Sequence, residues 1–144
     1  MTTNVRQQGV NVKLSRRTLR LTFRFANGEV RLLSYQRVDM ICPPSIGERP
    51  EAGKHSGFWM ELRGASGGVL FHRVLHSPFI RSARSPDGKV YLGTVAESVI
   101  EVLLPDDAAA KSVALIGQFL DAAKATQESA RGTRELARFD LPKG

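Results

Sequence analysis

Apolar side chains recur at every second position along much of this chain, which is the period of a β-strand with one buried face. The pattern is clearest over residues 18–25, where TLRLTFRF alternates bulky apolar residues with Thr and Arg. Asn27-Gly28 follows, and this pair favours a two-residue hairpin turn because both residue types tolerate positive φ. We therefore predict that residues 29–40 return as a partner strand, with a bulge near Ser34 where the alternation changes phase.

A second hairpin is predicted over residues 58–76. Its first strand, FWMELRG, alternates in the same way, and the small residues GASGG at 64–68 let the chain turn. The returning run over 69–76 is apolar at both sets of alternate positions, which predicts a strand covered on both faces. Trp59 lies on the face opposite Phe58, where it would either pack in a second apolar layer or mark a contact surface. We favour packing, because large aromatic side chains are usually buried.

Further strands are predicted at residues 90–93, 97–104 and 135–141 from the same alternation. Residues 43–57 and 79–89 are rich in the turn-forming residues Pro, Gly and Ser and are predicted to be loops. A loop as long as the first of these is uncommon inside a compact domain and is often functional.

Residues 108–123 allow two interpretations. An aspartate before the segment would suit the cap of a helix, whereas residues 112–116 would suit a strand paired to residues 99–104. We favour the strand, because Gly117 interrupts the apolar stripe that a helix would need. Residues 119–131 contain the strong helix formers Ala, Lys, Gln and Glu, which predicts one short C-terminal helix.

The chain has 144 residues, the length of one domain, and its single cysteine, Cys42, forbids an internal disulfide. The spacing of turns predicts an all-β, two-sheet antiparallel sandwich of about seven or eight strands over residues 18–141, after a flexible basic arm at 1–17. No apolar run approaches the roughly 20 residues of a membrane span, and the N-terminus lacks a secretory pattern. We therefore expect a cytoplasmic protein.

The run FWMELRG-x-SGG-VLFHRVLH-x-P, followed by EVLLPDD, resembles small immunoglobulin-like β-sandwich domains of bacterial proteins. The resemblance covers residues 18–141 and implies an immunoglobulin-like sandwich. Its motifs are structural, so it implies no catalytic or binding residues.

Charge is distributed unevenly along the chain. Residues 1–89 contain 15 Lys and Arg against 6 Asp and Glu, whereas residues 90–144 contain 6 against 8. Such asymmetry can indicate an anionic partner, although solvated arginines alone also produce it. Guanidinium groups grip phosphate or carboxylate in a fork. The candidate contacts for an anion or a partner are Arg16, Arg17, Arg20, Arg24, Arg81 and Arg84.

Motifs for catalysis, cofactors or metals are lacking. His72 and His76 are four residues apart, which on a strand separates them by roughly 13 Å, too far for one shared ion. Gly53-Lys54 lacks the other residues of a phosphate-binding loop, and no catalytic signature surrounds Cys42. We therefore expect no catalytic residue, no cofactor and no metal.

These patterns favour a non-enzymatic interaction or assembly module. It would bind a protein partner or a second copy of itself through an edge strand, through the Arg20 and Arg24 face, or through residues 77–89. The alternative is an anion-binding domain that contacts nucleic acid or acidic lipid through the six arginines. A small hydrolase built on Cys42 and a histidine is a remote third hypothesis.

Overall fold

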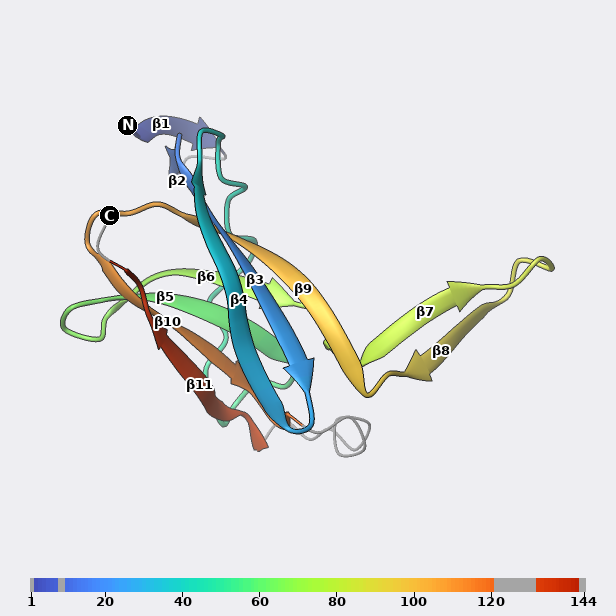
Figure 1. Ribbon diagram of the computed structural model, residues 1–144. Helices are drawn as coiled ribbons and strands as arrows, with labels where there is room; N and C mark the ends of the chain where they lie inside the picture. The colour runs from blue at the N-terminus through green and yellow to red at the C-terminus, as the bar shows by residue number, and fades with distance from the viewer. Residues whose placement is uncertain (1, 8–9, 121–131, 143–144) are drawn as a thin grey trace.

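Two antiparallel sheets of three and four strands stack face to face (Figure 1). This computed structural model describes residues 2–7, 10–120 and 132–142, within which the chain forms eleven β-strands and no α-helix. The all-β sandwich that the alternation predicted is therefore confirmed.

The three-stranded sheet has the order β4-β3-β9, and the four-stranded sheet has the order β11-β10-β5-β6. The strands of the first sheet are β3 (Thr18–Ala26), β4 (Glu29–Val38) and β9 (Glu97–Pro105). The strands of the second sheet are β5 (Phe58–Gly64), β6 (Val69–Leu75), β10 (Ala110–Gly117) and β11 (Arg134–Asp140).

The hydrophobic core lies between the two sheets and consists of the inward positions of the alternating strands. Each large side chain that becomes fully buried stabilises the fold by about 1.5–3 kcal/mol. The side chains of this core cluster are those of Leu19, Leu21, Phe23, Phe25, Met60, Leu62, Phe79, Val102, Leu104, Val113 and Leu115.

The β3–β4 hairpin has the turn and the bulge that the sequence predicts. Asn27 and Gly28 form the turn with φ values of 55° and 75°. Thr22 pairs with Ser34, but Phe23 pairs with Leu32, so Leu33 is the extra residue of a bulge. The bulge restores the phase of the alternation, because Leu32 then faces the core on the same side of the sheet as its neighbour Phe23.

The ambiguous segment forms the strand β10, as favoured from the sequence, but its predicted neighbour was wrong. β10 pairs with β5 and β11 in the four-stranded sheet, whereas residues 99–104 belong to β9 in the other sheet. Gly117 ends β10 where a Cβ atom would lie 2.4 Å from Cδ1 of Phe58, so only glycine fits there without displacing the ring. Residues 121–131, most of the predicted C-terminal helix, lie outside the described residues.

Two further hairpins lie outside the sandwich sheets. β1 (Thr2–Gln7) pairs with β2 (Val10–Ser15) within the segment that we predicted to be a flexible arm. β7 (Ile80–Arg84) pairs with β8 (Val90–Thr94), so the prediction of a loop over 79–89 was wrong for residues 80–84, whereas residues 85–88 form a turn. The sequence IRSAR is too short and too polar for alternation to reveal a strand, and only its pairing with β8 identifies it.

The long loop before β5 crosses the outer face of the four-stranded sheet, and we call residues 39–57 the strap. Near one edge of the sheet, Ser45 Oγ donates a hydrogen bond of 2.8 Å to the carbonyl oxygen of His72 in β6. At the other edge, the backbone N–H of Gly53 donates one of 2.7 Å to Thr133 Oγ1, just before β11. Trp59 between them is only 1% exposed, which confirms its packing in a second apolar layer with Ala114 and Ile116.

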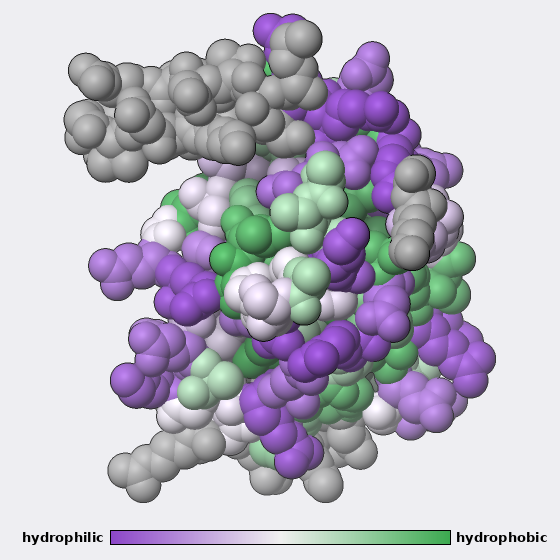
Figure 2. All heavy atoms as spheres, turned by 90° about the vertical axis from the view of Figure 1, so that its left-hand side faces the viewer, coloured by the Kyte–Doolittle hydropathy of each residue, from purple (hydrophilic) through white to green (hydrophobic). Residues whose placement is uncertain are grey.

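The end of the sandwich away from the β7–β8 hairpin faces the viewer in Figure 2. Hydrophilic residues cover most of this end, and hydrophobic residues are visible in patches between them. Mixed surfaces of this kind are normal for a folded domain.

Candidate functional site

β6 is an edge strand of its sheet, and its outward face is partly exposed. The prediction that both of its faces are covered was therefore wrong. In the described part of the chain, β6 has a single hydrogen-bonded neighbour, β5, and β9 likewise has only β3. The outward residues Leu70 and Val74 of β6 are 42% and 58% exposed. The apolar character of residues 69–76 therefore reflects exposed hydrophobic surface as well as core.

A groove of about 520 Å³ separates the free edges of β6 and β9. Its walls are two runs of consecutive residues, 73–78 and 98–103, together with Pro43. Because side chains alternate along a strand, a wall of consecutive residues consists of the strand edge itself, with its backbone groups. The groove is therefore bounded by the unpaired edges of two strands from different sheets.

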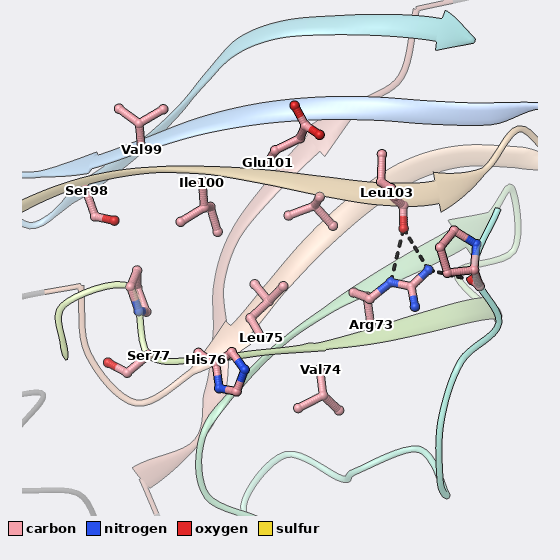
Figure 3. Close-up of a pocket in the computed structure, with 13 residues that line it drawn as sticks. Arg73, Val74, Leu75, His76, Ser77, Ser98, Val99, Ile100, Glu101 and Leu103 are labelled. Atoms are coloured by element: carbon pink, nitrogen blue, oxygen red, sulfur yellow. Dashed lines mark hydrogen bonds between the residues drawn. The ribbon is translucent and has the colours of Figure 1, made fainter. Parts of the chain in front are cut away.

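The side chains around the groove divide into an inner and an outer set. Leu75 and Ile100 point toward each other across the groove in Figure 3 and form an apolar floor. Val74 and Val99 point away from this floor and lie at the rims, where they are 58% and 52% exposed. The site therefore presents apolar surface beside free strand edges.

Arg73 closes one end of the groove by reaching from β6 to β9 (Figure 3). Its Nε and Nη2 atoms donate hydrogen bonds of 3.1 and 3.0 Å to the carbonyl oxygen of Leu103. Nη2 and Nη1 also donate to the carbonyl oxygens of Pro43, at 2.7 Å, and Pro44, at 3.0 Å. The guanidinium stacks on Phe71 at 4.9 Å from the ring centroid, so packing and hydrogen bonds both fix its position.

On the opposite side of the sandwich, between β4 and β11, side chains bridge the two sheets. The ring of Phe139 in β11 packs on Phe23 with a centroid separation of 5.4 Å. Arg37 Nη2 in β4 donates a hydrogen bond of 3.2 Å to the carbonyl oxygen of Pro142. The two lateral edges of the sandwich therefore differ, and the apolar groove lies at the edge formed by β6 and β9.

The β7–β8 hairpin projects from the body of the sandwich (Figure 1), and Ser77, Pro78 and Ser98, which flank it in the sequence, line the groove. Phe79 anchors its base, because this ring is 1% exposed and packs edge-on against Phe25 and Phe58. The backbone N–H of Val95 donates a hydrogen bond of 2.7 Å to the carbonyl oxygen of Phe79 and so extends the ladder to the base. The hairpin is therefore fixed at its base while its two strands join neither sheet.

Two of the predicted contact arginines, Arg20 and Arg24, lie on the outer face of β3, where carboxylates of β9 pair with them. Arg24 Nε lies 2.9 Å from Glu97 Oε1, and Arg20 Nε lies 3.5 Å from Glu101 Oε2. The hydrogen bond and the charge of Arg24 lower the pKa of Glu97, which keeps this carboxylate ionised. The predicted basic face is therefore largely neutralised within the sheet.

The other four candidate arginines lie elsewhere in the fold. Arg16 and Arg17 are exposed between β2 and β3, and Arg17 Nε lies 3.9 Å from Asp106 Oδ2. Arg81 and Arg84 belong to β7 in the projecting hairpin. The six residues thus occupy three separate parts of the molecule.

Cys42 has the surroundings of a buried structural cysteine. Its side chain is 3% exposed, and burial raises the pKa of the thiol despite the nearby Arg73. Sγ contacts Arg73 Nη2 at 3.6 Å and the carbonyl oxygen of Pro43 at 3.5 Å. Within the described residues, the hydrogen bonds of Cys42 Sγ are with Arg73 and Pro43 and not with a histidine, so the geometry gives no support to the hydrolase hypothesis.

His72 lies under the strap, and its burial predicts an acid-sensitive fold. Burial lowers the pKa of His72, with smaller lowering effects from Arg49 and Arg73 and an opposing effect from Glu61. Below the ordinary histidine pKa of about 6.5, the unfolded chain therefore binds more protons than the folded chain, and stability falls as pH falls.

We expect His72→Gln to lose less free energy of unfolding than the wild type between pH 7.5 and pH 5.5. Urea unfolding at each pH measures this difference. The matched control is His76→Gln at the exposed end of the groove, which retains His72 and should keep the wild-type pH dependence. Equal pH dependence of wild type and His72→Gln would contradict the prediction.

Other site classes find no support in the part of the chain that the structure describes. No three His, Cys, Asp or Glu side chains there are grouped so that they could hold a metal ion. No helix in the same residues is long and apolar enough to cross a membrane.

No protein-family model, curated protein or solved structure matches this chain. The resemblance to immunoglobulin-like domains therefore stays a prediction. Function is inferred from the groove and its surroundings.

Proposed function

We propose that this protein is a non-enzymatic module that binds an extended segment of a protein partner in the groove between β6 and β9. The observation that carries the proposal is the groove itself, with a free strand edge on each side and an apolar floor. The cytoplasmic location expected from the sequence is part of the same proposal.

Free strand edges recruit further strands, because their N–H and C=O groups have no partner within the sheet. An extended segment gains main-chain hydrogen bonds from such an edge and places alternate side chains into the neighbouring apolar surface. Folded proteins usually protect exposed edges with Lys, Pro or a bulge. Pro43 and Pro78 line part of this groove, but the exposed residues at its rims on β6 and β9 are Val74 and Val99, which favours a bound strand.

The ion pairs of β3 disfavour the alternative of an anion-binding face. Arg20 and Arg24 are each next to a carboxylate, and Arg24 forms a hydrogen bond with its partner. A nucleic acid or an acidic lipid would have to compete with these carboxylates for the guanidinium groups. A protein segment at the groove needs no such exchange.

The test is a selection from a displayed library of random twelve-residue peptides on the immobilised wild-type protein. We expect the enriched peptides to alternate apolar and polar residues, matching an extended strand on the groove floor. The double variant Val74→Lys, Val99→Lys should bind these peptides at least about 10-fold more weakly, a loss of about 1.4 kcal/mol. Fluorescence anisotropy with synthetic peptides measures the affinities.

The matched control is Leu33→Lys on β4, because Leu33 is 52% exposed, as Val99 is. It should bind the peptides as the wild type does, which separates a groove effect from a general effect of added charge. The proposal is wrong if no peptide discriminates between the groove variant and the Leu33→Lys variant. A wild-type dimer in sedimentation velocity that Val99→Lys dissociates would replace the partner segment with a second copy of this chain.

A further inference from the structure

We infer that the bound segment carries acidic residues where it leaves the groove beside the β7–β8 hairpin. The ligand class is then an apolar extended strand followed by an acidic stretch. This inference rests on the proposed function and adds the chemistry of the partner and the direction from which it enters.

The groove has one closed end and one open end. Arg73 and its hydrogen bonds to Leu103 and to the strap cross the closed end. The open end is lined by Ser77, Pro78 and Ser98, directly before β7 and after β8. A bound strand that extends beyond the groove must therefore leave it at the base of the hairpin.

The sequence of the hairpin gives it a net positive charge. Residues 77–96 contain Arg81, Arg84 and Lys89 but one acid, Asp87. Asp87 is occupied in the turn, where its carboxylate accepts hydrogen bonds from Ser85 Oγ and from the backbone N–H of Lys89. The hydrogen bond from Ser85 lowers the pKa of Asp87, so the net charge of the hairpin stays near +2 at neutral pH.

On the body of the sandwich, Arg20 and Arg73 lie toward the closed end of the groove, because Arg20 pairs with Leu103 in the β3–β9 ladder and Arg73 donates to the carbonyl oxygen of the same residue. Glu101 lies 3.5 Å from Arg20, and the Arg73 guanidinium is held by carbonyl oxygens. The positive charge available at the open end therefore comes from the hairpin. An isolated two-stranded hairpin is only marginally stable in water, so contacts from an acidic segment would also stabilise its strands.

The experiment uses one groove-binding peptide in three forms: with Glu at the end that leaves the groove, with Gln there instead, and with Glu at the opposite end. Placing a charge at either end also identifies the direction of the bound segment. Affinities are measured for the full-length wild type and for the triple variant Arg81→Gln, Arg84→Gln, Lys89→Gln. The matched control is Arg16→Gln, Arg31→Gln, Lys54→Gln, which removes the same charge from exposed positions outside the hairpin.

We expect the peptide with Glu at the open end to bind the wild type on the order of 10-fold more tightly than the Gln form, from two or three ion pairs with the hairpin cations. This advantage should shrink at high salt, disappear in the hairpin variant and remain in the control variant. The comparison of the two peptides on the wild type holds even if the hairpin variant is less well folded.

The two proposals can fail separately. Equal affinities of the Glu and Gln forms at either end, with both forms weakened by Val74→Lys, Val99→Lys, would overturn the acidic stretch but leave the groove in place. Tight binding of a single-stranded oligonucleotide that depends on the three hairpin cations, and not on the groove, would also overturn it. The absence of any groove-dependent peptide would overturn the proposed function itself.

Discussion

Glu61→Ala is expected to lower the free energy of unfolding by about 3–5 kcal/mol, the usual cost of removing one partner from a buried ion pair. The Glu61 residue is 7% exposed and accepts hydrogen bonds from Trp59 Nε1, at 3.1 Å, and from Arg63 Nε and Nη2, at 3.2 and 2.8 Å. Truncation leaves the indole N–H and the Nε and Nη2 atoms of Arg63 without this acceptor, while Arg63 Nη1 keeps its contact with Glu135. Urea unfolding followed by circular dichroism measures the loss.

The matched control for this prediction is Glu97→Ala. Glu97 also pairs with an arginine, but its side chain is 56% exposed, so its removal should cost less than about 1 kcal/mol. Glu61→Gln should fall between the two, because the amide oxygen still accepts from Trp59 while one charge is lost. A loss in Glu61→Ala no larger than that in Glu97→Ala would show that the buried pair is not essential.

Gly117→Ala should destabilise the protein by about 1–3 kcal/mol, the usual cost of overpacking a core. In most strands the same change is favourable, because alanine loses less backbone entropy than glycine. Here the new Cβ would lie 2.4 and 2.7 Å from Cδ1 and Cε1 of Phe58 and 3.1 Å from Cδ1 of Leu136. Phe58 is 1% exposed and packs edge-on against Phe79, so its ring has no free space to enter. Chemical denaturation measures the sign and the size of the change in the free energy of unfolding.

The control is Gly68→Ala in the β5–β6 turn, where the nearest contact of a Cβ atom would be Ser66 Oγ at 3.7 Å. This change should not destabilise the protein. Phe58→Leu combined with Gly117→Ala should lose less free energy of unfolding than the sum of the two single changes, because the smaller side chain relieves the contact. Additive losses would mean that the ring of Phe58 does not oppose the new methyl group.

Alternation predicted the strands of the sandwich because it reports which side chains face the core. It does not report which strands are neighbours, so the pairing of β10 with residues 99–104 was predicted wrongly. The same limit applies to β6, whose apolar outward residues suggested a covered strand. Val74 is instead exposed on an edge strand. The order of strands in a sheet depends on contacts along the whole chain, so the pattern of one strand does not reveal it.

The groove could not be predicted from the sequence, because residues 79–97 separate its two walls and the walls belong to different sheets. No sequence motif singled out Arg73, yet its guanidinium reaches the backbone of Leu103 in the other sheet. The carboxylates opposite Arg20 and Arg24 could more readily have been predicted. Glu97 and Glu101 occupy alternate positions of a predicted strand, and pairing that strand with β3 would have placed opposite charges together.

The strap makes the only tryptophan a natural optical reporter. Trp59 is shielded on a sheet face by a segment fastened near both edges, at Ser45 and at Gly53. Release of either fastening would let water reach the indole and shift its emission to longer wavelength while the circular dichroism of the strands persists. Fluorescence and circular dichroism that change at different denaturant concentrations would therefore identify detachment of this segment as a step separate from global unfolding.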